Sequence, residues 1–240
     1  MSVVIQPWRL ILAAFGWSAA GFAAVALIGL VIYAAIRAAG FAFDWGPASV
    51  AFGILVQLSF LLVARRQGRR LGDGSVSAGL GETPIRRPWL VVGLIAADLV
   101  LEQAWEAGLS LIPAMDAQMQ AARSLFSAIF DDPATILPEL ISGVIIAPIS
   151  EELFFRGWLW TGLSRVWSPL SVAAVTGGLF ALFHIGNTWA YPLLILPAAI
   201  MLSAVRHYGG SVHASILAHM LNNSLAMIGQ LIDGAISLHT

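Results

Sequence analysis

The chain has 240 residues, of which 59% are hydrophobic and only 10% are charged, and it contains no cysteine. Soluble domains carry about 25% charged residues, so this composition excludes an ordinary soluble fold and predicts an integral membrane protein. The net charge of −1 excludes nucleic-acid binding driven by bulk electrostatics. The absence of cysteine excludes disulfides, thiolate metal sites and a cysteine nucleophile.

Seven runs of about 20 apolar residues predict membrane-spanning helices. We expect the spans at 10–36, 48–64, 89–110, 135–163, 168–187, 190–206 and 211–232. The first run is much longer than the about 7–15 residues of a signal-peptide core, so we expect an uncleaved span there. A capping side chain before a proline, at Asp132–Pro133 and at Ser168–Pro169, supports two of the starts.

The segment 111–130 is amphipathic, and we expect an interfacial helix there rather than an eighth span. No alternating β-barrel pattern is present, and an open sheet edge would leave backbone groups unsatisfied in lipid. The predicted fold class is therefore all-α: a polytopic transmembrane helical bundle of about seven spans, or eight if 111–130 crosses. We expect residues 1–240 to form a single integral membrane domain.

The arginines predict an orientation. The loop between the second and third spans holds one cluster of them: Arg65, Arg66, Arg69, Arg70, Arg86 and Arg87. An excess of basic residues marks cytoplasmic loops, so this loop and the N-terminus are expected to be cytoplasmic. Alternating spans then place Arg9, Arg165 and Arg206 on the same side. Since every basic residue is arginine, which hints at a bacterium, the expected location is a bacterial inner (plasma) membrane.

Glu151 and Glu152 lie in one of the most apolar stretches of the chain, and Arg156 follows them. Placing a charge in hydrocarbon costs about 2.5–3.5 kcal/mol even on a lenient insertion scale. We therefore expect these side chains to have charged or polar partners, to face a water-filled cavity, or to have a function. Glu152 and Arg156 are four residues apart on one helix face, which predicts a structural ion pair. Glu151 points about 100° away. It must therefore meet water or a group on another helix, which suits a general base or acid.

Polar residues on two later spans join this argument. His184 ends an apolar run with Phe180 one turn before it, and His219 and Asn223 share one face of the last span. Each of these, taken alone, is more typical of interhelical hydrogen bonding than of catalysis. Together with Glu151, however, they supply a carboxylate, two imidazoles and an amide on three spans. Water activation and oxyanion stabilisation require such a set.

These residues form three motifs in order: EELFFR at 151–156, FALFH at 180–184 and HMLNN at 219–223. The series resembles that of the CPBP family, the CAAX-protease and bacteriocin-processing membrane proteases, also called the Abi family. The resemblance covers about 135–232, the expected catalytic core, while the first 130 residues carry no motif. It implies an intramembrane endopeptidase that hydrolyses a peptide bond in a membrane-embedded or membrane-proximal protein or peptide.

The resemblance also implies a catalytic role for four positions. Glu151 would be the general base that activates water, and His184 would hold or polarise that water. His219 and Asn223 would donate hydrogen bonds to the tetrahedral oxyanion, a role that contributes about 3–4 kcal/mol per donor.

Three further positions, Glu152, Arg156 and Phe180, are expected to orient the site rather than react. The family has been described both as metalloproteases and as metal-independent glutamate proteases, so a catalytic zinc stays an alternative. Its ligands would be Glu151, His184 and His219. We favour no metal, because no HExxH helix is present and these side chains come from three different helices.

Other function classes stay open. One is a non-catalytic membrane scaffold or regulator of the same fold, and another is a proton-coupled transporter, since buried acids and histidines also form proton relays. The third span carries an acid stripe, Asp98, Glu102 and Glu106, which fits a polar cavity wall as well as a solvated interfacial position. Like charges at this spacing disfavour a helix, so the stripe is not expected to face lipid. The sequence leaves open the substrate, its prenylation and the oligomeric state.

Overall fold

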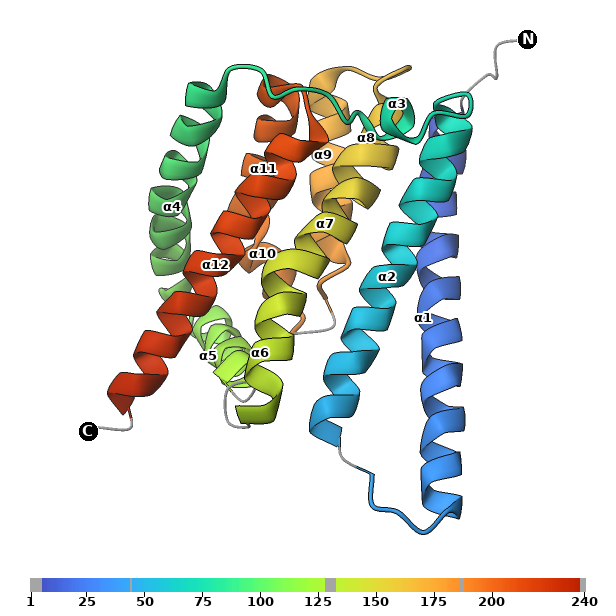
Figure 1. The fold of residues 1–240 in the computed structure, drawn as a ribbon. Helices are drawn as coiled ribbons and strands as arrows, with labels where there is room; N and C mark the ends of the chain where they lie inside the picture. The colour runs from blue at the N-terminus through green and yellow to red at the C-terminus, as the bar shows by residue number, and fades with distance from the viewer. Residues whose placement is uncertain (1–5, 44, 128–132, 186–187, 238–240) are drawn as a thin grey trace.

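The computed structural model describes residues 6–43, 45–127, 133–185 and 188–237, and every regular element within these ranges is a helix (Figure 1). The predicted all-α bundle is therefore confirmed. The elements, with η for a π-helical segment, are α1 (Pro7–Ala38), α2 (Trp45–Leu71), α3 (Val76–Leu80), α4 (Pro88–Ser110), α5 (Pro113–Ser127), α6 (Pro133–Ile141), η2 (Ser142–Ile146), α7 (Ala147–Glu152), η3 (Leu153–Leu159), α8 (Trp160–Leu163), α9 (Pro169–Leu182), α10 (Tyr191–Leu194), α11 (Leu196–Gly209) and α12 (Val212–Ser237).

Helices stand at all seven predicted spans, and those from α6 to α8 form one continuous rod. Among the described residues, three helical stretches are long and apolar enough to cross a membrane: Pro7–Ala38, Gly46–Leu71 and Ala134–Leu163. The predicted amphipathic segment 111–130 contains α5. The last residues of that segment, 128–130, lie outside the described residues. Seven crossings, and an interfacial α5, stay predictions.

The local sequence explains where several helices begin and end. At the start of α9, the Ser168 hydroxyl accepts the backbone N–H of Ser171 at 3.3 Å, and Pro169 takes the first helical position, as predicted. The corresponding cap at Asp132 lies outside the described residues.

Two predicted spans are wrong in their helical extent: one helix ends early, and the other span is interrupted. Helix α9 stops at Leu182, so His184 lies in the turn that follows rather than within the span 168–187. The predicted span 190–206 is divided into α10 and α11, with Pro197 in the first turn of α11. Proline has no N–H to extend a preceding helix, which accounts for this break.

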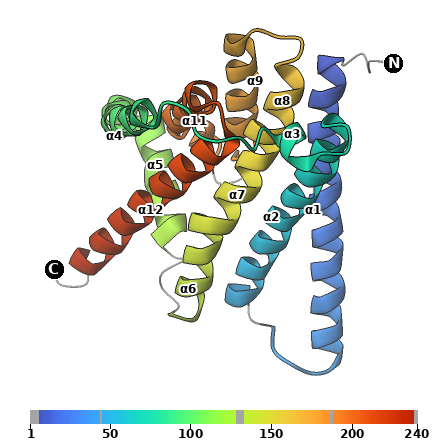
Figure 2. The same ribbon diagram turned by 45° about the horizontal axis from the view of Figure 1, so that its top comes forward.

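The helices alternate in direction, so one end of the bundle gathers the start of α1, the segment containing α3, and the α8–α9 and α11–α12 turns (Figures 1 and 2). Hydrogen bonds join these segments. Ser211 donates to the Thr83 carbonyl at 2.5 Å, and Arg165 donates to the Leu71 carbonyl at 2.6 Å. The predicted gathering of arginines at one end is therefore confirmed, while the side of the membrane that this end faces stays a prediction.

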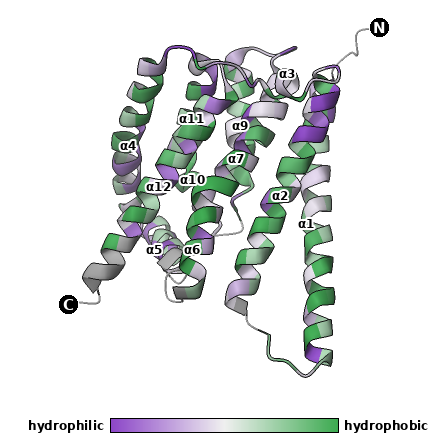
Figure 3. Ribbon diagram, viewed as in Figure 1, coloured by the Kyte–Doolittle hydropathy of each residue, from purple (hydrophilic) through white to green (hydrophobic). Residues whose placement is uncertain are grey.

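Helix α1 lies at one edge of the bundle beside α2 in both views (Figures 1 and 2). Only Ala14 and Val25 of its residues are buried, and most of its length is hydrophobic (Figure 3). An exposed apolar surface this extensive is normally covered by a partner or by lipid. Because several helices are apolar enough to need such a cover, the chain is an integral membrane protein.

The centre of the bundle is the segment 150–160, in which every residue is buried. Helix α7 and η3 pack there against α2, α9 and α12. Phe154 meets Phe60 of α2 edge-to-face at 4.8 Å between ring centroids, and Phe155 meets Phe180 of α9 at 5.6 Å. Such pairs contribute about 0.5–1.5 kcal/mol beyond their buried area. The best-packed hydrophobic residues therefore surround the glutamates.

Candidate active site

The continuous helix from α6 to α8 carries Glu151 and Glu152 in α7. It departs from α geometry on both sides of these glutamates, at η2 and η3. Within η2, the N–H of Ala147 donates to the carbonyl five residues earlier, that of Ser142. The next residue, Pro148, has no N–H to offer the Gly143 carbonyl. Asn223 of α12 supplies the missing donor, since its Nδ2 lies 2.8 Å from the Gly143 oxygen. Wide turns of this kind occur often at functional sites.

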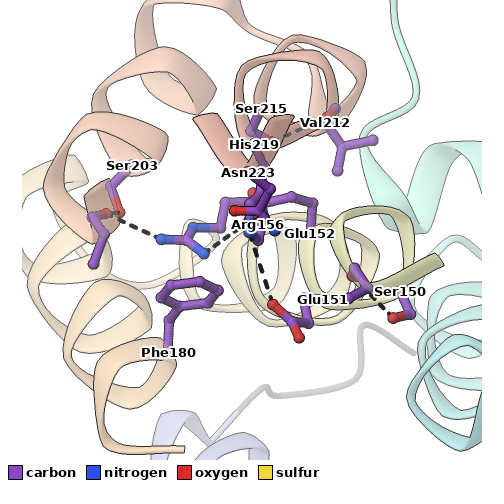
Figure 4. Close-up of polar contacts among 12 residues, drawn as sticks. Ser150, Glu151, Glu152, Arg156, Phe180, Ser203, Val212, Ser215, His219 and Asn223 are labelled. Carbon is purple, nitrogen blue, oxygen red and sulfur yellow. Dashed lines mark hydrogen bonds and ion pairs between the residues drawn. The ribbon is translucent and has the colours of Figure 1, made fainter. Parts of the chain in front are cut away.

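Glu152 is fully buried, and its Oε1 accepts two hydrogen bonds (Figure 4). Nη1 of Arg156 donates at 3.0 Å, and Nδ1 of His219 lies 3.1 Å away. The predicted ion pair is therefore confirmed. Arg156 is itself fully buried, donates through Nη2 to the Ala199 carbonyl at 3.0 Å, and stands 4.4 Å above the Phe180 ring. These contacts join η3 to α9, α11 and α12.

Glu151 has a different set of partners, as its position on the helix predicted. Its Oε1 accepts a hydrogen bond from Nε2 of Gln57 on α2 at 2.7 Å. Its Oε2 lies 4.0 Å from Nε2 of His184 and 4.0 Å from Nε2 of His219. Three of the four residues predicted to be catalytic therefore meet around one carboxylate oxygen. The fourth, Asn223, bonds the backbone of η2 instead.

The bonds at Nδ1 of each imidazole decide which nitrogen carries the proton. Nδ1 of His184 lies 2.8 Å from the Phe180 carbonyl oxygen, which can only accept a hydrogen bond. Nδ1 of His219 faces Glu152, which is an acceptor while its salt bridge keeps it ionised. We therefore assign the Nδ1–H tautomer to both neutral rings. The lone pairs of both Nε2 atoms then face Glu151.

A separation of 4.0 Å is too long for a direct hydrogen bond but suits a bridging water molecule. A water at this place would meet three acceptors: the Glu151 Oε2 and the two imidazole lone pairs. Its two O–H groups can bind two of these acceptors at a time, Oε2 and one imidazole, which leaves the lone pairs of its oxygen free to attack. The arrangement can therefore take a proton from water.

Sequence reasoning missed Gln57 and its link to Ser150. The Ser150 hydroxyl donates to Oε1 of Gln57 at 2.5 Å, and this fixes the amide so that Nε2 points to Glu151. A signal was present, since Gln57 is an isolated amide within an apolar span. Polar side chains at such positions face the protein interior or water rather than lipid.

Sequence reasoning also treated Arg206 only as a marker of orientation. The structure buries it at 8% exposure, and its Nε donates to the Arg156 carbonyl at 2.8 Å. A second buried cation therefore supports the backbone of η3 beside the ion pair.

The acid stripe of α4 faces neighbouring helices, as expected of acids that avoid lipid. Glu102 accepts a hydrogen bond from Asn222 of α12 at 3.0 Å, and Glu106 forms an ion pair with Arg123 of α5. Asp98 is 3% exposed, and neither of its oxygens has a hydrogen-bond partner among the residues that the structure describes. Glu102 and Glu106, which follow Asp98 along the helix, therefore join α4 to α12 and to α5.

The donor types around Glu151 suit zinc, but the geometry does not. Metal–ligand bonds of about 2.0–2.2 Å hold the donors of a tetrahedral site about 3.3 Å apart, whereas Oε2 of Glu151 lies 4.0 Å from each Nε2. Within the described ranges, no group of three or more His, Cys, Asp or Glu side chains is arranged to hold a metal ion. We derive no step through a metal.

Comparison with known proteins finds a family match over the segment that carries the site. Residues 133–225 match the family described as type II CAAX prenyl endopeptidase Rce1-like, and this range contains all three motifs. Over this range the chain is similar to the Rce1-like proteases of the CPBP family. The resemblance to this family is therefore confirmed for residues 133–225, the segment that carries Glu151.

Part of the chain is also similar to a curated protein. The chain is 32% identical over 89 residues to the UPF0177 protein YbdI of Lactococcus lactis subsp. lactis (strain IL1403), which covers 37% of this chain and 47% of that protein. The chain thus spans about half the length of the curated relative it matches. No solved structure matches the chain.

Replacing Arg156 by alanine is expected to destabilise the protein by about 3–5 kcal/mol, because Glu152 would stay buried without its cation. The matched control is Arg123→Ala, which breaks an ion pair whose side chains are 66% and 36% exposed and should change stability by less than about 1 kcal/mol. Folded yield and thermal unfolding in detergent measure both effects. Equal stability of the two variants would contradict the account of the buried pair.

Proposed function

We propose that the protein is an intramembrane peptidase that hydrolyses a peptide bond in a membrane-embedded or membrane-proximal protein or peptide. One observation carries the proposal: Oε2 of Glu151 lies 4.0 Å from Nε2 of both His184 and His219 at the buried centre of the bundle. The similarity of residues 133–225 to the Rce1-like family supports a peptidase at the level of the family.

In the proposed reaction Glu151 acts as the general base. Its Oε2 takes a proton from water as the water oxygen bonds to the peptide carbonyl carbon, giving a tetrahedral intermediate with a negative oxygen. The C–N bond then breaks, and the proton passes to the leaving amine from Glu151 or an adjacent imidazolium. General acid–base catalysis of this kind contributes about 10²–10⁴-fold.

The tautomers refine the role proposed for His219. A neutral ring with its proton on Nδ1 offers only a lone pair at Nε2, so it cannot donate to an oxyanion. After His219 accepts the proton, Nε2–H becomes a donor and Nδ1–H keeps its bond to Glu152. Asn223 would add a donor through the Nδ2 hydrogen that does not bind Gly143. Preorganised donors of this kind are the usual means of oxyanion stabilisation.

Gln57 is proposed as a positioning residue rather than a catalytic one. By holding Oε1 of Glu151 at 2.7 Å, it turns Oε2 toward the two imidazoles. Ser150 holds the amide in the orientation that makes this bond, through its own 2.5 Å hydrogen bond to Gln57.

The proposed substrate class follows from the membrane setting. The site is built into a bundle with exposed apolar helices, so its peptide would arrive from the bilayer or its surface. The matching family is described as CAAX prenyl endopeptidase, and a prenylated CAAX end is one member of this class. We propose a bacterial inner membrane with the arginine-rich end and the N-terminus in the cytoplasm, since basic residues concentrate on that side.

A proton-coupled transporter is the second candidate. Asp98 favours it, because its buried carboxyl oxygens have no hydrogen-bond partner among the described residues and could carry a proton. The peptidase is preferred because the residues that converge on Glu151 are those of the three family motifs.

Replacing Glu151 by glutamine is expected to lower peptide hydrolysis by about 10²–10⁴-fold, because the amide cannot accept the proton of water. Glu139→Gln, on the same helical rod but outside the motifs, is the control and should retain activity. Proteomics of membrane protein termini should show one uncleaved precursor accumulating only in the Glu151→Gln strain. Processing at the normal rate in that strain would refute the assignment of the base.

Replacing Gln57 by leucine is expected to lower kcat/KM by about 10–100-fold, since a hydrogen bond to a charged group contributes about 1.5–3 kcal/mol. Thermal stability should fall as well, because Oε1 of the buried Glu151 loses its donor, so kcat/KM is compared per amount of folded protein. The Ser150 hydroxyl can then donate to the Ala147 carbonyl, 3.0 Å away. The control Ser59→Ala removes a hydroxyl of the same helix that bonds the Val56 carbonyl. A Gln57→Leu enzyme as active as Ser59→Ala would exclude the positioning role.

The proposed reaction uses no metal, so activity should survive prolonged treatment with a chelator, and elemental analysis should find no stoichiometric metal in the active protein. Loss of activity on chelation, restored by zinc, would instead assign Glu151, His184 and His219 as ligands. Elemental analysis of Glu151→Gln then tests that assignment directly, because a lost ligand lowers the bound metal.

A further inference from the structure

One face of α2 changes from apolar to basic along its length. Leu55, Leu58 and Leu62 are 41%, 40% and 69% exposed, and Arg65 and Arg69 continue the same spacing of three and four residues. Residues so spaced are neighbours on one helix face. They form a continuous ridge, called here the Leu-Arg stripe: Leu55, Leu58, Leu62, Arg65 and Arg69. Its basic end lies at the hydrophilic end of α2 (Figure 3).

A hollow of about 490 Å³ lies at the basic end of the stripe. Its lining consists of Leu62, Arg65, Arg66, Arg69, Arg70 and Val76. All four arginines are exposed, and no carboxylate among the described residues forms a salt bridge with any of them. Arg66 also lies over the Trp17 ring of α1, at 5.6 Å from its centroid. Four positive charges therefore line one hollow without a salt bridge to any carboxylate that the structure describes.

The dimensions of the stripe fit one leaflet of a bilayer. At about 1.5 Å per residue, Leu55 to Leu62 covers about 10 Å, which lies within the about 15 Å of hydrocarbon in a leaflet. Arg65 and Arg69 follow about 5 and 10 Å beyond Leu62, where the headgroups begin. The stripe also avoids the active site, because Gln57 reaches Glu151 from a different face of α2. A ligand here would thus meet apolar side chains in the hydrocarbon and guanidinium groups at the interface.

We propose that the Leu-Arg stripe and its hollow bind one anionic phospholipid, with the phosphate at Arg65 and Arg69 and an acyl chain along the leucines. Guanidinium groups bind phosphate oxygens in pairs of parallel hydrogen bonds. Basic clusters beside a membrane span attract anionic headgroups by about 1 kcal/mol per residue. This site does not depend on the proposed peptidase activity, so either can fail without the other.

The test compares lipid binding to the purified full-length protein by native mass spectrometry, with phosphatidylglycerol and phosphatidylcholine of identical acyl chains. The expected result is retention of one phosphatidylglycerol in preference to phosphatidylcholine. The double variant Arg65→Gln/Arg69→Gln should bind phosphatidylglycerol about 30-fold more weakly. The matched control, Arg86→Gln/Arg87→Gln, removes the same charge from a second hollow lined by those residues. It should bind like the unaltered protein.

Further arms identify what is bound. Leu58→Ser/Leu62→Ser keeps every charge and should also weaken phosphatidylglycerol binding, whereas unchanged binding would show that no acyl chain lies along the leucines and would overturn the proposal. Competition by inorganic phosphate as strong as that by the lipid would identify a free-anion site and overturn it too. Equal retention of the two lipids, or equal loss in both arginine double variants, would likewise refute it. Thermal unfolding in uncharged detergent confirms that each variant is folded.

Discussion

The buried ion pair between Glu152 and Arg156 is the interaction on which the site depends. Removing two charges from water costs more than their attraction returns unless further hydrogen bonds are made. Here those bonds come from His219 on α12 and from the Ala199 carbonyl on α11, with the Phe180 ring of α9 beneath the guanidinium. The contacts of this one buried pair therefore join three helices to the helix that carries the glutamates, while Oε2 of Glu152 and Nε of Arg156 have no hydrogen-bond partner among the described residues.

This constraint separates two neighbouring glutamates into different roles. The carboxylate of Glu152 accepts both Arg156 and His219 through one oxygen, so it is committed to structure. Glu151, about 100° around the helix, is anchored through one oxygen by Gln57 and presents the other to two imidazole nitrogens. His219 connects the two glutamates, since Nδ1 faces Glu152 and Nε2 faces Glu151. The structural pair thus sets the tautomer of a ring that faces the proposed base.

The positions of the helices and the buried ion pair could be predicted from the sequence, because both depend on the spacing of nearby residues. The i,i+4 spacing of Glu152 and Arg156 predicted their pairing, and apolar runs predicted where the helices lie. That three distant motifs meet rested on the family resemblance, because hydrophobic periodicity does not fix which helix faces pack together. Gln57 was missed for the same reason, since its role depends on the contact between α2 and α7.

Other features needed backbone geometry. Asn223 was predicted to serve an oxyanion, yet it completes a hydrogen bond that Pro148 cannot make in η2. Hydropathy does not distinguish a π segment from an α-helix, so this bond had no signal in the sequence. His184 was placed inside a span, but its ring bonds the Phe180 carbonyl and the helix ends before it.

The protonation of the two imidazoles tests the account most directly. Solid-state NMR of nitrogen-15-labelled histidine in bilayers, with His184→Gln and His219→Gln used to assign signals, reports which ring nitrogen carries the proton. The account predicts that, when neutral, both rings are protonated at Nδ1 and have a free lone pair at Nε2, toward Glu151. A neutral ring protonated at Nε2 in either residue would contradict it, because that nitrogen would donate to Glu151 instead of accepting from water.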